Sequence, residues 1–247
     1  VNENIKDLYR VKFHDERFGV LRLDMNENPE GLPREIVDAV MSKVTPEYIA
    51  SYPEKDRLMK LLAEHDGIAY ENISVTSGSD EAMRLIFQCF GQLGRKLITV
   101  TPTFEMYGVY ARMFGMKHET VGYKEDFSVN PTEIMRAITQ DTGIIILLNP
   151  NSPIGYTYYE KDVRAIIECA QKVGSIVVID EAYHYFYAPT FMSLIKEYDN
   201  LFVLRTFSKL FSMAGLRIGY VSGNAEFIDY IERAESTFNV NNIAILF

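Results

Sequence analysis

The sequence predicts an α/β fold in which a mostly parallel, doubly wound sheet is flanked by helices. Short apolar runs rich in β-branched residues alternate with longer stretches of helical periodicity along nearly the whole chain. At 247 residues and 47% hydrophobic content, the chain can bury a large core. No repeat, low-complexity tract or internal linker divides it. We therefore expect one large α/β domain.

The expected strands are short apolar runs bounded by turn residues. They cover residues 73–76, 96–100, 144–148, 175–179, 201–204 and 217–221. Two early helices are expected over residues 33–44 and 54–65. Further helices are expected to begin near residues 79, 105, 131, 160, 191 and 225. Asn130-Pro131 is a typical start, because a capping side chain precedes a proline in the first turn.

Charge and composition exclude several classes of function. The net charge of −9 and the pI near 5.1 argue against a nucleic-acid partner, which requires clustered Lys and Arg. No apolar run approaches a membrane span, and Val1-Asn2-Glu3-Asn4 lacks a signal-peptide pattern, so we expect a cytoplasmic protein. Cys89 and Cys169 lie in apolar helical segments and the four histidines are scattered, so we expect reduced thiols and no metal site.

A lysine, an arginine and an aspartate lie close to the ends of two expected strands. Lys209 and Arg217 follow the strand at 201–204, while Asp180 and Tyr183 follow the strand at 175–179. The carboxyl ends of parallel strands are where ligands bind in open α/β sheets. A lone lysine is usually a solvated cation and a lone strand-terminal aspartate is usually a helix cap. Together they favour pyridoxal phosphate (PLP), which needs an amine for its aldehyde, a cation for its phosphate and a carboxylate for its pyridine nitrogen.

An anion site is expected where the first strand turns into a helix. Gly78 allows the sharp turn, and the helix beginning near Ser79 offers free amides and the positive end of its dipole. An ordinary Ser-capped helix is the alternative without Arg217. Because the side chains of Asp80 and Glu81 would repel a phosphate, the backbone amides would bind it.

Further motifs follow in a fixed order along nearly the whole chain. They are Leu23-Asp24-Met25-Asn26-Glu27-Asn28-Pro29, Ser51-Tyr52-Pro53-Glu54, Thr76-Ser77-Gly78-Ser79-Asp80-Glu81, Pro102-Thr103-Phe104-Glu105-Met106-Tyr107, and Asn149-Pro150-Asn151-Ser152-Pro153-Ile154-Gly155. With the segment from Arg205 to Val221, they make the chain resemble the class I/II aminotransferases of PLP fold type I. The similarity is greatest to the histidinol-phosphate aminotransferase branch, which implies a role in histidine biosynthesis.

The resemblance assigns roles around the cofactor ring. Lys209 would form the Schiff base and then move a proton between the substrate α-carbon and the cofactor. Asp180 would keep the pyridine nitrogen protonated, and Tyr183 would bond the phenolic oxygen. Phe104 would stack on the ring, at a position where the branch usually has tyrosine. The usual asparagine before Pro-Thr-Gly is replaced by Ser152, and Asn151 is the alternative donor.

The resemblance also assigns the phosphate, the substrate and a partner. The phosphate would be held by Gly78, Ser79, Asp80, Ser208 and Arg217, with Thr206 a weaker candidate and Tyr52 reaching it from the second subunit of a homodimer. The amino donor would contact Asn26 and Glu27. Residues 1–30 would form an N-terminal arm and residues 31–247 the large PLP-binding domain. Family members continue for about another 100 residues, so the C-terminal small domain, with the arginine that grips the substrate carboxylate, is expected to be missing.

The resemblance implies amino transfer between a donor such as histidinol phosphate and 2-oxoglutarate. A PLP-dependent decarboxylase similar to threonine-phosphate decarboxylase shares much of this framework. A non-catalytic PLP-binding remnant and a doubly wound domain without cofactor are the remaining alternatives.

Overall fold

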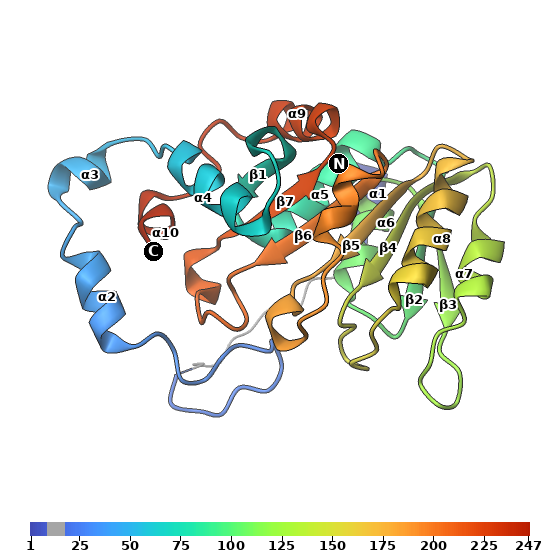
Figure 1. The fold of residues 1–247 in the computed structure, drawn as a ribbon, viewed down its shortest axis with the longest axis horizontal. Helices are drawn as coiled ribbons and strands as arrows, with labels where there is room; N and C mark the ends of the chain where they lie inside the picture. Colours follow the sequence, from blue (N-terminus) through green and yellow to red (C-terminus); the bar gives the residue numbers. More distant parts are fainter. Residues whose placement is uncertain (9–17) are drawn as a thin grey trace.

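The computed structural model describes residues 1–8 and 18–247 and confirms the expected α/β fold. In this part of the chain seven strands form a single sheet with the order β1-β7-β6-β5-β4-β2-β3 (Figure 1). The strands are β1 Ile73–Thr76, β2 Lys96–Thr101, β3 Lys117–Gly122, β4 Thr142–Leu148, β5 Ile176–Asp180, β6 Leu201–Thr206 and β7 Gly219–Gly223. Only β7 runs antiparallel to its neighbours, β1 and β6. The sheet is therefore mostly parallel, as predicted.

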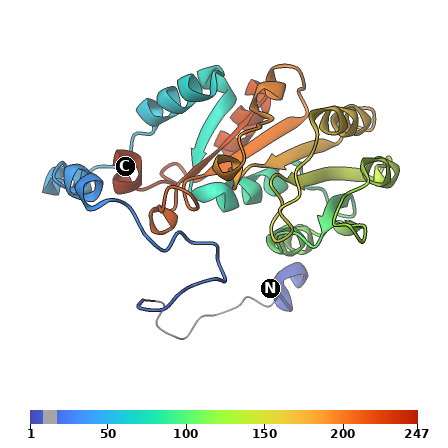
Figure 2. The ribbon, with the colours of Figure 1, turned by 60° about the horizontal axis from the view of Figure 1, so that its bottom comes forward.

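Helices cover both faces of the sheet, which Figure 2 shows from a second direction. The helices are α1 Glu3–Lys6, α2 Arg34–Met41, α3 Pro46–Ala50, α4 Asp56–Asp66, α5 Gly78–Phe90, α6 Met106–Met113, α7 Pro131–Ala137, α8 Glu160–Gln171, α9 Ala225–Ala234 and α10 Asn242–Leu246. One buried cluster joins the sheet to α4, α7, α8 and α10, and the other joins it to α5, α6 and α9. The two clusters are the two halves of a doubly wound core.

Several elements differ from the sequence-based expectation, and the short helices α1, α3 and α10 were not expected. The strand β3 was not expected, because the run Lys-His-Glu-Thr-Val-Gly is polar and only Val121 is buried at this edge of the sheet. The helix expected from residue 191 is the short 3-10 helix Met192–Lys196. Arg217 does not open a strand: it has φ 54°, in the left-handed region, and β7 begins at Gly219.

The alternation of side chains along a strand separates two acidic neighbours at the end of β5. Val177 and Ile179 face the cluster that includes α8, while Ile176 and Val178 face the cluster that includes α5. Asp180 continues the second series and bonds Tyr107, whereas Glu181 bonds Arg205 on the opposite side. Adjacent carboxylates thus serve different parts of the molecule.

The helices α2 and α3 lie outside the main body in Figure 1, whereas α1 contacts α6. Among residues 1–8 and 18–247, no helix is both long enough and apolar enough to cross a bilayer. The expected N-terminal arm over residues 1–30 includes residues 9–17, which lie outside the described part of the chain.

Candidate functional site

Most of the residues predicted to bind the phosphate lie where β7 begins, between the ends of β1 and β6. Gly219 is the pairing partner of both Thr76 and Thr206. A β-carbon on Gly219 would lie 2.6 Å from the carbonyl oxygen of Arg205 and 2.7 Å from the amide nitrogen of Ser79. Only glycine permits this approach, which brings the start of α5 against the strand that leads to Lys209.

Gly78 and Arg217 form the base of a candidate anion cradle. Gly78 has φ +76°, and a β-carbon there would lie 2.9 Å from Nη2 of Arg217. The guanidinium therefore lies directly over the first residue of α5. Within the described structure no side chain caps the start of this helix, whose first amides remain available to an anion. A guanidinium beside free helix amides is an arrangement that binds phosphate.

The acidic side chains in the first turn of α5 have partners of their own. Oε2 of Glu81 accepts hydrogen bonds from the backbone amide of Ser77, at 2.6 Å, and from Nδ2 of Asn239, at 3.1 Å. Oδ1 of Asp80 accepts a hydrogen bond of 2.8 Å from the hydroxyl of Tyr110. This agrees with the expectation that α5 offers backbone amides, rather than side chains, to an anion.

Thr206 and Ser208 add a buried pair of hydroxyls to the same region. The threonine Oγ1 donates to the serine Oγ at 2.9 Å and accepts from the serine backbone amide at 3.2 Å. Since the serine oxygen accepts one bond here, its own hydroxyl hydrogen can be donated elsewhere. The geometry supports Ser208 as a direct anion ligand and Thr206 as the residue that orients it.

Asp180 is a buried carboxylate with two neutral donors. It is 5% exposed, and it accepts hydrogen bonds from the hydroxyl of Tyr107 at 2.9 Å and from the amide of Ala182 at 3.0 Å. Burial raises the pKa of Asp180 to about 6, and these two hydrogen bonds oppose the shift. The sequence analysis did not assign Tyr107 a role. Its place three residues after Phe104 in the same motif was the available signal.

Lys209 lies close to the end of β5 and to the N-terminal segment. Its Nζ donates a hydrogen bond of 2.7 Å to the carbonyl oxygen of Met25 and lies 5.8 Å from the centroid of the Tyr183 ring. Burial lowers the pKa of the Lys209 amine, while Glu27 and Asp180 oppose this effect. A partly desolvated amine is more readily deprotonated, as nucleophilic and basic lysines must be.

Asn26 connects the N-terminal segment to two predicted cofactor ligands. Its Nδ2 donates to the hydroxyl oxygen of Tyr183 at 2.8 Å and lies 3.4 Å from Oγ of Ser152. Asn151 points elsewhere, because its Nδ2 donates to Oγ1 of Thr103 at 3.0 Å. Sequence reasoning assigned Asn26 to the substrate and did not anticipate its bond to Tyr183.

Two predicted aromatic ligands are exposed. Phe104 is 43% exposed and meets the buried Tyr107 edge to face, with ring centroids 5.5 Å apart. Tyr52 is 73% exposed and stacks on Phe238, with centroids 4.0 Å apart. Phe104 is thus next to the ring that supports Asp180, while the described contact of Tyr52 is with a residue near the end of the chain.

The side chains near the carboxyl ends of β1, β5 and β6 fit the chemical groups of PLP. Asp180 is a buried anion without a cationic hydrogen-bond partner among the described residues, which suits a protonated pyridine nitrogen. The amine of Lys209 suits the aldehyde, and the amides of α5 with Arg217 suit the phosphate. No group of three or more potential metal ligands occurs in the described residues.

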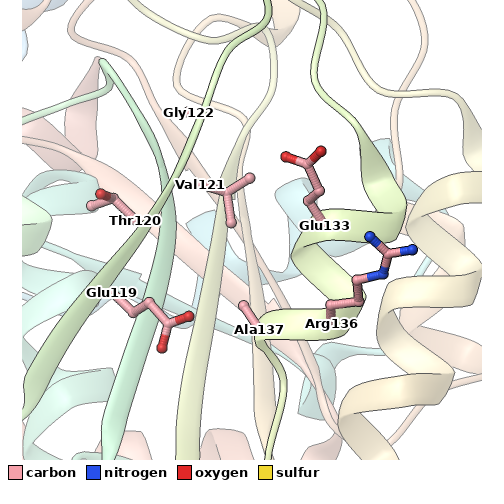
Figure 3. A pocket seen from close by; sticks show the side chains of 7 residues that line it. All are labelled: Glu119, Thr120, Val121, Gly122, Glu133, Arg136 and Ala137. Carbon is pink, nitrogen blue, oxygen red and sulfur yellow. The ribbon is translucent and has the colours of Figure 1, made fainter.

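A cavity of about 350 Å³ lies elsewhere, beside β3 and α7. Figure 3 shows the residues that line it, which are Glu119, Thr120, Val121, Gly122, Glu133, Arg136 and Ala137. None of the predicted site residues belongs to it, and β3 is the strand at the opposite edge of the sheet from β1. It is not part of the candidate site.

Comparison with known proteins places these observations in a family. Residues 19–245 match the profile described as aminotransferase class I and II. The chain is 34% identical over 247 residues to a histidinol-phosphate aminotransferase of Thermoanaerobacter pseudethanolicus, covering 99% of this chain and 69% of that protein.

Solved structures share the fold at lower sequence identity. The crystal structure of histidinol-phosphate aminotransferase from Sinorhizobium meliloti in complex with pyridoxal-5'-phosphate has a TM-score of 0.81 at 22% identity, covering 90% of this chain and 61% of that one. A mutant aspartate aminotransferase of Thermus thermophilus also has a TM-score of 0.81, at 23% identity, covering 89% of this chain and 64% of that one. The chain therefore spans less than two thirds of each of these structures.

Proposed function

The chain belongs to the class I and II aminotransferases, and from this premise we propose that it is the large domain of a PLP-dependent aminotransferase acting on histidinol phosphate or a related amino donor. The observation that carries the proposal is the arrangement of Lys209, Asp180 and Arg217 at one edge of the sheet. The negative charge of Asp180 raises the pKa of the Lys209 amine, and the positive charge of Arg217 lowers it. The relatives named histidinol-phosphate aminotransferase support this donor, and 2-oxoglutarate would be the acceptor.

The chain's own side chains would divide the work of holding the cofactor. When bound, PLP supplies an electron sink for the pair left at the donor's α-carbon and carries the amino group between donor and acceptor. The amine of Lys209 would hold its aldehyde carbon. Arg217, Ser208 and the first amides of α5 would hold its phosphate, and Phe104 would cover its ring.

Asp180 and Tyr183 would control the protons on the cofactor ring. A carboxylate at Asp180 favours the protonated form of the ring nitrogen, and Tyr107 keeps that carboxylate in place. The hydroxyl of Tyr183 would donate to the phenolic oxygen. Both effects strengthen the electron-withdrawing character of the ring.

Lys209 would also act as general base and general acid at the donor's α-carbon. Its amine has a lowered pKa because it is partly buried, so a neutral form is accessible. Glu27 lies close enough to influence that pKa. We therefore propose that Asn26 and Glu27 of the N-terminal segment contact the amino donor.

We also propose a homodimer in which Tyr52 reaches the phosphate site of the partner subunit. Tyr52 follows α3, and Ile36, Met41 and Ile49 on α2 and α3 are exposed with it. These helices extend away from the main body in Figure 1. Such apolar surface on an extension suits an isologous contact with a second copy. The cytoplasmic location expected from the sequence stays a prediction.

The decisive test is the site of covalent attachment together with the reaction catalysed. Protein from the complete reading frame should be yellow with PLP, and borohydride reduction followed by peptide mapping should place the pyridoxyl group on Lys209. Histidinol phosphate with 2-oxoglutarate should yield glutamate, and Lys209→Ala should yield none. Label on another lysine would refute the assignment. Release of CO₂ without a keto acid would favour the decarboxylase, and neither reaction would indicate a binding remnant.

A further inference from the structure

We propose that Asn26 is a positioning residue that acts through Tyr183: its amide fixes the tyrosine hydroxyl so that the hydroxyl hydrogen points to the phenolic oxygen of the cofactor. This inference rests on the proposed function, because it concerns PLP held by Lys209. It differs from a role of Asn26 in contacting the amino donor.

The first observation is the direction of the hydrogen bond. Nδ2 of Asn26 carries hydrogens only, so the oxygen of Tyr183 must be the acceptor in the 2.8 Å contact. The single hydroxyl hydrogen of Tyr183 is then left for another acceptor. A hydroxyl that accepts one hydrogen bond is also polarised into a better donor. The contact therefore prepares Tyr183 to donate to an anionic oxygen.

The second observation is the neighbouring Ser152. Its Oγ lies 3.4 Å from the same Nδ2, so the second amide hydrogen of Asn26 faces this oxygen. Of the two side-chain amides in the loop before Ser152, Asn151 donates to Thr103, and Asn149 accepts a hydrogen bond from the backbone amide of Tyr158 through its Oδ1. Asn26 is thus the side-chain amide that reaches the hydroxyls of both Tyr183 and Ser152.

The third observation is that the backbone around Asn26 is held in place. Nδ2 of Asn28 donates to the carbonyl oxygen of Leu210 at 3.3 Å, and this contact does not use the Lys209 amine that would hold the cofactor. Asn26 itself has φ 53°, a left-handed conformation that asparagine tolerates better than most residues. The segment therefore presents the Asn26 amide to Tyr183 in a fixed orientation.

These contacts predict a spectroscopic effect. A hydrogen bond donated to the phenolic oxygen makes that oxygen a weaker acceptor for the proton on the nitrogen that joins Lys209 to the cofactor, so the pKa of this nitrogen is lower. Removing the Asn26 amide should make the Tyr183 hydroxyl a weaker donor. We expect Asn26→Gly, which keeps the left-handed backbone accessible, to raise the pH midpoint of the visible absorbance by about 0.5–1 unit. Asn26→Asp, which is isosteric but cannot donate when ionised, should also raise it.

The controls separate this role from a general effect on the segment. Leu23→Ala shortens a side chain of the same segment that is 79% exposed and should leave the midpoint unchanged. Tyr183→Phe should raise the midpoint, and adding Asn26→Gly to it should produce no further rise, because the amide acts through the tyrosine hydroxyl. A wild-type protein without a visible band would refute the proposed function. A normal band whose midpoint responds to Tyr183→Phe but not to Asn26→Gly would refute only the role of Asn26.

Discussion

The guanidinium of Arg217 lies against Gly78, so that a β-carbon at Gly78 would be 2.9 Å from Nη2. This contact joins the first residue of α5 to the residue two positions before the start of β7. It places a fixed cation beside the free amides of a helix start. The closeness of the two residues leaves no room for a side chain.

Gly78→Ala should therefore weaken PLP binding. The added methyl group pushes the guanidinium away from the phosphate, and loss of one charge-assisted hydrogen bond lowers affinity by about 10- to 100-fold. Titration of the cofactor-free protein with PLP, followed by visible absorbance, measures the effect. Gly174→Ala is the matched control, because Gly174 has φ +66° but no atom lies within 4 Å of its added β-carbon. It should lose stability without losing affinity. Equal affinities in both variants would contradict the cradle.

The buried Asp180 should make the cofactor-free protein less stable as pH rises. Its pKa is about 6 in the folded protein, above the ordinary value of 3.8, because the carboxylate is buried. The folded state therefore binds more protons between pH 4 and 6, and the free energy of unfolding falls as pH rises through that window. The difference in pKa corresponds to roughly 3 kcal/mol.

Asp180→Asn should consequently stabilise the cofactor-free protein at pH 8, by up to about 3 kcal/mol, with less gain toward pH 4. Urea denaturation at several pH values measures this. With PLP bound, the difference in the free energy of unfolding between Asp180→Asn and the wild type should shrink or reverse, because the protonated ring nitrogen gives the wild-type carboxylate a cationic partner. A gain that is unaffected by PLP would argue against a contact between Asp180 and the ring.

Arg205 holds a second buried network beneath the site. Its Nη1 lies 2.7 Å from Oδ1 of Asp66 and its Nη2 lies 2.9 Å from Oε2 of Glu181, with all three side chains at most 3% exposed. Arg205→Met would leave two buried carboxylates without a cation, and we expect a loss of about 3–5 kcal/mol in the free energy of unfolding. Arg164→Met removes an exposed pair with Glu197 and should cost far less. Similar losses in the two variants would show that burial does not govern the network.

The sequence was sufficient to predict the parts of the site that lie on strands. The apolar runs of β5 and β6 predicted strands. Because parallel strands bring their carboxyl ends to one edge of the sheet, Asp180 and Lys209 were expected to lie close together. The polar run of β3 gave no comparable signal, because only one of its side chains is buried. Pairing at the edge of the sheet, rather than hydrophobic burial, makes it a strand.

Side-chain contacts between residues far apart in the sequence could not be predicted in this way. Asn26 and Tyr183 are 157 residues apart, and Tyr107 and Asp180 are 73 apart. Neither contact follows from the period of a helix or strand. The bond between Asn26 and Tyr183 depends on where a segment without periodicity crosses the edge of the sheet, which the local sequence does not determine.

The last prediction concerns the proposed dimer. If Tyr52 completes the phosphate site of the partner subunit, each active site combines Lys209 from one chain with Tyr52 from the other. Lys209→Ala and Tyr52→Ala homodimers should both be impaired. Subunit exchange between them creates hybrid dimers with one intact and one doubly altered site. Equal mixing should then restore about a quarter of wild-type activity, because half the dimers are hybrids and each has one intact site.

A mixture of Lys209→Ala with Asp180→Ala provides the matched control. Those two residues lie in the same subunit, so every site in such a hybrid carries one of the two changes and activity should not recover. Sedimentation of the separate variants should show dimers in each case, since neither Lys209 nor Asp180 belongs to the exposed surface of α2 and α3. Recovery in neither mixture, with exchange confirmed by differently tagged subunits, would place Tyr52 outside the partner's site. Its stacking on Phe238, a contact within one chain, would then account for its position.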